Sequence, residues 1–315
     1  MYVEMIKTRD GVVGQPGKIV LSGASGMLGT ALRQRLAARG TSVVQLVRGA
    51  TRRKEQVAWD PSATPAIADP SALEGCTAAV HLSGANVAAH RWTAAYRREM
   101  RTSRVDSTRA LAQTLAGLRE APRTLVVASA VGIYGDRGEE VLNEDSAPGE
   151  GFLADVCRAW EEAARPAAEA GMRVVQTRFG IVVGRGPGAL EKMLPVFRLG
   201  LGGKLASGRQ WMSWISLEDT VAAILFALQT RSLAGPVNVV SPHAVTNAEF
   251  TATLARQLHR PAVLPVPAFA LRLALGQMAD EALLASARVM PAKLLAIGFE
   301  FAHPTLDEAL AAAIN

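Results

Sequence analysis

Three glycines spaced three residues apart give the strongest chemical signal in this sequence of 315 residues. Gly23, Gly26 and Gly29 lie between a short β-branched run, 18–22, and a segment in which leucines recur every four residues. In such a turn the first glycine permits the bend, the second admits a pyrophosphate, and the third allows close helix packing, while the helix N-terminus receives the anion. The pattern predicts a dinucleotide-binding turn made by Gly23, Ser25, Gly26, Met27, Leu28 and Gly29.

A cation follows the next expected strand, 41–47, where a carboxylate would select NAD. An Asp or Glu at this point accepts the ribose 2′-hydroxyl, whereas a guanidinium suits a 2′-phosphate. The chain has Arg48 there, with the basic run 52–54 just beyond. We therefore predict NADP(H) in preference to NAD(H). The alternative is that Arg48 only points into solvent.

Small residues follow a third expected strand, 78–82. Gly84 and Ala85 could lie against a ribose or nicotinamide, although a simple tight turn explains them equally well. On the helix expected next, Arg97, Arg101 and Arg104 recur on one face, with Glu99 nearby. That face is either solvated or in contact with the phosphate and ribose groups of the cofactor.

The elements that must position these residues alternate between strand and helix. This alternation predicts an α/β fold, a Rossmann-like doubly wound parallel sheet with a smaller, mostly helical C-terminal substrate lobe. We expect a leader at 1–17, a nucleotide-binding domain at 18–180 and the lobe at 181–315, with a strand at 235–240 returning to the first sheet. Further strands are expected at 124–129 and 173–177, and helices at 92–118, 152–170 and 217–228.

The composition of the chain indicates which kinds of ligand and partner it can bind. The net charge is +6, and 28 of the 34 basic residues are arginine, which favours a phosphorylated small molecule over nucleic acid. The apolar stretches fall short of the ~20 residues of a membrane span, and the first 18 residues lack the apolar core of a signal peptide, which predicts a cytoplasmic protein. Two cysteines and five scattered histidines predict no metal site.

Taken together, these motifs resemble the extended short-chain dehydrogenase/reductase superfamily, and more narrowly its atypical branch of epimerase family proteins. The resemblance runs from about residue 18 to residue 310. It rests on residues 23–29, 86–93, 103–104, 129–135, 152–154, 160–162, 178, 180, 197–203, 207–211, 214 and 218–219. The resemblance implies a substrate lobe after Gly180, a possible homodimer, and cofactor contacts at Val47, Arg48, Leu82, Ser83, Glu99 and Arg104.

The catalytic pattern departs from that superfamily. A typical member uses a tyrosine whose phenol pKa is lowered from ~10 by a lysine four residues later. None of the three tyrosines here has a lysine at that spacing. Ser129 at a strand end could hydrogen-bond a substrate oxygen, and Tyr134 is the only tyrosine expected near it, although loop capping and packing explain both equally well.

Four residues are candidates for substrate binding: Arg178, Arg209, Trp211 and Trp214. Arg209 suits a phosphate and an indole can stack on a ring, but packing between the lobes is the alternative. Glu161 could face the same cleft, although solvation of its helix is the favoured interpretation. The sequence predicts an NADP(H)-dependent oxidoreductase or epimerase-like enzyme for a small polar substrate such as a nucleotide sugar. The alternative is a non-catalytic NADP(H)-binding or redox-sensing module.

Overall fold

Seven parallel strands form the central sheet of the computed structural model, which describes residues 17–314. The expected leader therefore lies, apart from residue 17, outside the described residues. Across the sheet the strands are β3 (Gln56–Ala58), β2 (Val43–Val47), β1 (Ile19–Ser22), β4 (Ala78–His81), β5 (Thr124–Ala130), β7 (Arg173–Phe179) and β11 (Gly235–Val239). The order reverses between β1 and β4, and in open parallel sheets ligands bind outside the carboxyl ends of the strands at such a point.

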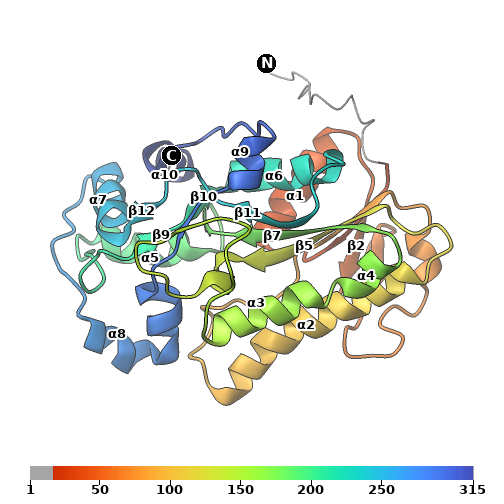
Figure 1. The fold of residues 1–315 in the computed structure, drawn as a ribbon, viewed down its shortest axis with the longest axis horizontal. Helices are drawn as coiled ribbons and strands as arrows, with labels where there is room; N and C mark the ends of the chain where they lie inside the picture. The colour runs from red at the N-terminus through yellow and green to blue at the C-terminus, as the bar shows by residue number, and fades with distance from the viewer. Residues whose placement is uncertain (1–16, 315) are drawn as a thin grey trace.

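Helices cover both faces of this sheet (Figure 1). On one face lie α1 (Met27–Ala38) and α6 (Leu217–Gln229), and on the other lie α2 (Ala94–Ala116), α3 (Phe152–Glu162) and α4 (Arg165–Glu169). The sequence of β1 is continuously apolar because both faces of the strand are covered. Ile19 and Leu21 pack into the core on one face of the sheet and Val20 into the core on the other, and all three are fully buried. The predicted doubly wound parallel sheet is confirmed.

The helix expected over 152–170 is instead two helices. Helix α3 ends at Glu162, two alanines follow, and Pro166 is the second residue of α4. Proline has no N–H to donate to the carbonyl four residues earlier, and its ring would clash with that carbonyl. A single continuous helix over 152–170 was therefore the wrong prediction, because Pro166 lies inside that range.

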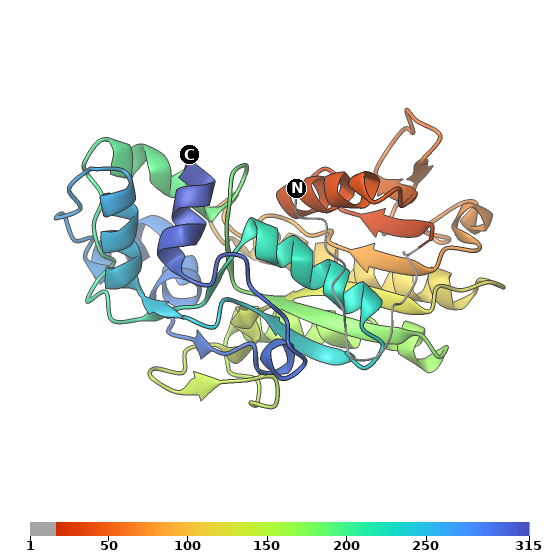
Figure 2. The same ribbon diagram turned by 90° about the horizontal axis from the view of Figure 1, so that it is seen from above.

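A second core lies beyond the carboxyl ends of the strands. Trp214, Phe250 and Leu310 are buried there together, between helices α5 (Ala189–Arg198), α7 (Asn247–Gln257) and α10 (Leu306–Ile314). Figure 2 shows these helices gathered at the end of the sheet toward which the strand arrows point. The chain thus places a smaller lobe over the edge where a ligand would bind.

Short elements complete the fold. They are β6 (Val141–Leu142), β8 (Ile181–Val183), β9 (Trp211–Met212), β10 (Trp214–Ser216), β12 (Val245–Thr246), β13 (Arg288–Val289), α8 (Ala268–Leu275), α9 (Ala292–Ala296), and the single turns η1 (Pro70–Leu73), η2 (Val131–Tyr134) and η3 (Ala279–Leu284). Within residues 17–314, no helix combines the length and apolar character that crossing a membrane requires.

Candidate cofactor and active site

The turn between β1 and α1 is packed so closely that two of its glycines have no room for a side chain. A Cβ on Gly29 would lie 2.1 Å from the carbonyl oxygen of Gly23. Gly23 has a φ of +70°, and a Cβ there would lie 2.7 Å from the carbonyl carbon of Leu82. Both positions therefore require glycine for the turn to close.

Gly26 is different, because its surroundings are open. Its φ is −72°, which any residue can adopt, and the nearest atom to an added Cβ lies 3.5 Å away. Gly26 caps α1 without a side-chain hydrogen bond, and the first turn of the helix carries no acidic residue. The free N–H groups of this helix start can therefore receive an anion.

Arg48 lies directly after the end of β2 and is exposed. No acidic group of residues 17–314 forms an ion pair with its guanidinium. The neighbouring Arg52, Arg53 and Lys54 are exposed as well. The positive charge of Arg48 at the carboxyl end of β2 is therefore not neutralised by any acidic side chain of residues 17–314.

Helix α2 holds the loop that follows β4. Arg104 Nη2 donates to the carbonyl of Ala85 at 2.9 Å, and the hydroxyl of Ser103 accepts from the backbone N–H of Ala85 at 3.0 Å. The guanidinium lies against Gly84, where an added Cβ would be 3.3 Å from its carbon. Burial lowers the pKa of Arg104, while Glu99 on the same helix is exposed. Arg104 therefore supports the loop that borders the glycine turn.

His81 lies fully buried behind that turn. The hydroxyl of Ser107 donates to the carbonyl of Ser103 at 2.6 Å, so it must accept from His81 Nε2, 3.1 Å away. His81 Nδ1 then accepts from the hydroxyl of Ser22 at 2.6 Å. Burial lowers the pKa of His81 to about 3, so the ring is neutral and ties β1, β4 and α2 together.

A buried polar cluster lies at the carboxyl ends of β5 and β7. Arg178 Nε and Nη2 donate to the two carboxylate oxygens of Glu161 at 2.8 and 2.9 Å. Ser129 Oγ donates to Glu161 Oε1 at 2.7 Å. Burial alone would lower the pKa of Arg178, but the hydrogen bonds and charge of Glu161 outweigh it and raise that pKa. Arg178 on β7 and Ser129 on β5 thus share the single carboxylate of Glu161 on α3.

Tyr134 belongs to the same cluster and is fully buried. Its hydroxyl accepts from Arg178 Nη1 at 2.9 Å and donates to Asn238 Oδ1 at 2.7 Å. Burial raises the pKa of the phenol, which is the opposite of what an acid/base tyrosine needs near neutral pH. The structure therefore gives Tyr134 a place in the network, with its hydroxyl already hydrogen-bonded to Arg178 and Asn238.

The residues expected to bind substrate separate into two environments. Trp214 is fully buried in the second core, and its indole N–H donates to the carbonyl of His243 at 2.9 Å, so it leaves no face for a ligand. Arg178 is buried in its ion pair. Arg209 is exposed beside a cavity of about 310 Å³, and Trp211 is half-buried with the guanidinium of Arg288 4.3 Å from its ring centre.

The sequence interpretation missed two members of the buried cluster. Glu161 was expected to be solvated, yet its side chain is only 14% exposed. Its signal was present, because Cys157, one helical turn earlier, belongs to the buried face of α3. Asn238 could have been noticed as a polar residue inside the short apolar strand β11.

Comparison with known proteins gives these features a family. Residues 19–258 match the model described as the NAD dependent epimerase/dehydratase family. The chain belongs to this family. Residues 266–313 match a further model, described as a domain of unknown function, DUF1731. The family's NAD(P)-binding fold accounts for the glycine turn at the point where the strand order reverses.

Three relatives show how far the similarity extends. The epimerase family protein Mb2239 of Mycobacterium bovis is 44% identical over 292 residues, which cover 93% of this chain and 96% of that protein. The crystal structure of human epimerase family protein SDR39U1 (isoform 2) with NADPH has a TM-score of 0.87 and 33% identity, covering 94% of this chain and 98% of the human one. A nucleoside-diphosphate sugar epimerase from Corynebacterium glutamicum is 34% identical with a TM-score of 0.77, covering 95% of this chain and 58% of that one.

Proposed function

We propose that this protein binds NADP(H) along the carboxyl ends of β1, β2 and β4 and catalyses hydride transfer to or from a small polar substrate such as a nucleotide sugar. The observation that best supports this proposal is that the N-terminus of α1 has no side-chain cap and no acidic residue in its first turn, while Arg48 after β2 is exposed and forms no ion pair within the described residues. The NADPH bound to human SDR39U1 supports the same cofactor here. Among the described residues, no group of three or more His, Cys, Asp or Glu side chains is placed so that it could hold a metal ion.

Each part of the cofactor has a proposed partner. The pyrophosphate would rest on the N–H groups of the glycine turn, and the 2′-phosphate of the ribose would meet Arg48. The proposed contacts are Gly23, Ser25, Gly26, Met27, Leu28, Gly29, Val47, Arg48, Leu82, Ser83, Gly84, Glu99 and Arg104. Arg104 would act mainly through the loop that it holds, because its guanidinium is already bonded to Ala85.

The proposed chemistry centres on Ser129. When bound, NADP(H) supplies or accepts a hydride at its nicotinamide. The Ser129 hydroxyl would turn from Glu161 to donate a hydrogen bond to the substrate oxygen, and a water would carry the proton that a tyrosine carries elsewhere in the superfamily. Arg178 would hold Glu161 in place. On the substrate side, Arg209 would meet a phosphate and Trp211 a ring.

A second candidate is a module that binds NADP(H) without turning over a substrate. It is favoured by the missing lysine after each tyrosine and by the enclosure of the Tyr134 hydroxyl. A panel of nucleotide sugars, aldehydes and ketones, added to the NADPH-loaded protein, separates the two. Oxidation of NADPH by a member of the panel favours the enzyme, and unchanged NADPH absorbance with every member favours the module.

Cofactor binding itself is tested by titrating NADPH and NADH and following energy transfer from tryptophan to nicotinamide. We expect NADPH to bind more tightly, and Arg48→Glu to weaken NADPH much more than NADH. Arg231→Glu is the matched control, because it changes the net charge equally at an exposed site before β11, at the other edge of the sheet. Equal losses for both cofactors would remove Arg48 from the site, and no binding of either would end both candidate functions.

Three predictions about location and partners remain to be tested. They are a cytoplasmic location, the lack of nucleic-acid binding and a homodimer. Sedimentation of the purified protein with and without an oligonucleotide measures the last two at once.

A further inference from the structure

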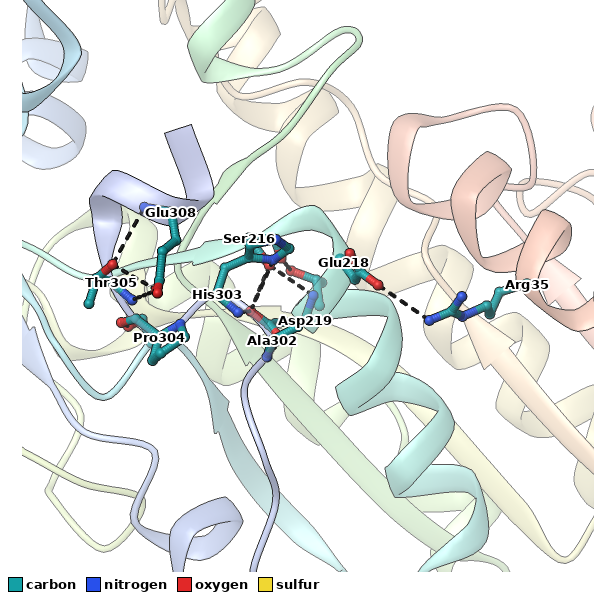
Figure 3. Close-up of polar contacts among 11 residues, drawn as sticks. Arg35, Ser216, Glu218, Asp219, Ala302, His303, Pro304, Thr305 and Glu308 are labelled. Carbon is teal, nitrogen blue, oxygen red and sulfur yellow. Dashed lines mark hydrogen bonds and ion pairs between the residues drawn. The ribbon is translucent and has the colours of Figure 1, made fainter. Parts of the chain in front are cut away.

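A cavity of about 470 Å³ lies between α1, α6 and α10, and neither the glycines of the turn nor Arg48 belong to its lining. Residues 183–185 form one of its walls. Figure 3 shows the polar groups at this junction, where the sheet domain and the smaller lobe meet. The volume of the cavity falls within the range of small-molecule sites, about 300–1,000 Å³.

Small apolar side chains give the cavity its room. Helix α1 contributes Ala31 and Ala38, and α10 contributes Ala309, Ala312 and Ala313. The remaining apolar lining consists of Val183, Leu217 and Val221. A hydrocarbon chain can therefore be covered from two helices that belong to different lobes.

Of the three charged side chains that line the cavity, Arg35, Glu218 and Arg185, only the first two form an ion pair within the described chain. Arg35 and Glu218 pair with each other at 3.4 Å, and both side chains are 52% exposed, so their charges largely cancel. Arg185 is exposed and forms no ion pair with any residue between 17 and 314. The chemistry of the opening thus favours an anion.

His303 adds a donor that has no partner. Neither of its ring nitrogens forms a hydrogen bond within the described part of the chain, and Nδ1 is buried. The nearest carboxylate, Asp219, lies 4.0 Å from Nδ1 and is already occupied by the Ser216 hydroxyl and by the backbone N–H groups of Ala302 and His303 (Figure 3). The imidazole of His303, which is not hydrogen-bonded to any described residue, therefore lines the same cavity as Arg185.

We propose that this cavity is a second ligand site, separate from the cofactor site, which binds a monocarboxylate with a short hydrocarbon chain. The carboxylate meets Arg185 and His303, and the chain lies against the alanines of α1 and α10. A neutral hydrocarbon ligand would leave the arginine unused, and a bare inorganic anion would leave the apolar walls unused. The polar residues Arg185 and His303 therefore select for a carboxylate, and the apolar walls select for a hydrocarbon chain.

Calorimetric titration of the full-length protein tests the ligand class. Hexanoate should bind with a stoichiometry of one. Hexan-1-ol should bind at least about tenfold more weakly because it lacks the charge-assisted contact, and inorganic phosphate at least about tenfold more weakly because it lacks the apolar contact. Saturating NADPH should leave the hexanoate stoichiometry unchanged. Absence of hexanoate binding, equal binding of hexan-1-ol, or displacement of hexanoate by NADPH would each overturn the proposal.

Two pairs of variants test the position. Ala38→Leu fills the cavity and should abolish hexanoate binding, whereas Ala37→Leu, at an exposed alanine of the same helix outside the lining, should leave it unchanged. Arg185→Gln should weaken hexanoate at least about tenfold, and Arg231→Gln should have no effect. Hexanoate binding that survives Ala38→Leu at the original affinity would place the ligand elsewhere and refute this site.

Discussion

Arg178 on β7 and Glu161 on α3 form a two-point ion pair, with side chains that are only 7% and 14% exposed. The pair lies between the hydroxyls of Ser129 and Tyr134 and contacts both of them. Close to the carboxyl ends of β5 and β7, this chain therefore holds a buried arginine–carboxylate pair that is hydrogen-bonded to both hydroxyls.

Breaking this pair should be costly. We expect Glu161→Gln to destabilise the protein by about 3–5 kcal/mol, because the variant leaves a buried guanidinium without its counter-charge. Glu162→Gln is the matched control, since its neighbouring carboxylate pairs with Arg165 at the surface and should contribute at most about 1 kcal/mol. Urea unfolding of both variants measures the difference. Equal stabilities would show that the Arg178–Glu161 pair is solvated in solution.

The glycine turn offers a variant that should separate binding from folding. Gly26→Ala fits the backbone and should change the free energy of unfolding by no more than about 1 kcal/mol. Its methyl group would nevertheless stand where a pyrophosphate approaches, so NADPH affinity should fall at least about tenfold. Gly29→Ala should instead destabilise the fold, because its Cβ would lie 2.1 Å from a carbonyl oxygen.

The control for that experiment is Gly117→Ala. Gly117 ends α2 with a φ of −86°, and an added Cβ would be 3.6 Å from its nearest atom. Neither stability nor NADPH affinity should change appreciably. If Gly26→Ala binds NADPH as well as Gly117→Ala does, the pyrophosphate does not lie at the start of α1.

The sheet and its glycine turn could be predicted because their determinants are local. A β-branched run, a turn that requires glycine and an amphipathic helix follow one another within about twenty residues of sequence. The interruption at Pro166 was also local and could have been noticed. These features reflect backbone geometry, which the neighbouring residues largely decide.

The polar cluster could not be predicted in the same way, because burial depends on residues far away in the sequence. The hydroxyl of Tyr134 donates to Asn238, 104 residues later, and nothing near Tyr134 announces that partner. Trp214 is similar, since its burial depends on Phe250 and Leu310 closing over it. The sequence around a tyrosine or tryptophan looks the same whether its side chain contacts a ligand or packs into a hydrophobic core.

Both cysteines should be unreactive in the folded protein. Cys76 and Cys157 are buried, and burial raises both thiol pKa values, that of Cys157 to about 12. Because the thiolate is the reactive form, Ellman's reagent at mildly alkaline pH should label neither residue until denaturant is added. Rapid labelling of Cys157 in the native protein would show that the core beneath α3 opens readily.

His81 should make stability depend on pH. Its pKa is about 3 in the folded protein and ~6.5 when unfolded, so below ~6.5 the unfolded chain takes up a proton that the native state refuses. Stability is therefore complete above that pH and is lost as the pH falls toward 3. Between about pH 7.5 and about pH 5 the loss from this residue should be about 2 kcal/mol.

Urea unfolding at the two pH values isolates this effect when three proteins are compared. His81→Gln should lose about 2 kcal/mol less than the unmodified protein over that interval, whatever its absolute stability. His243→Gln, which replaces an exposed ring, should follow the unmodified protein. Should His81→Gln prove too unstable to study, the His81 ring resonances give the same answer, because they should not titrate above about pH 4. A midpoint near 6.5 would mean that the Ser22–His81–Ser107 chain is open to water.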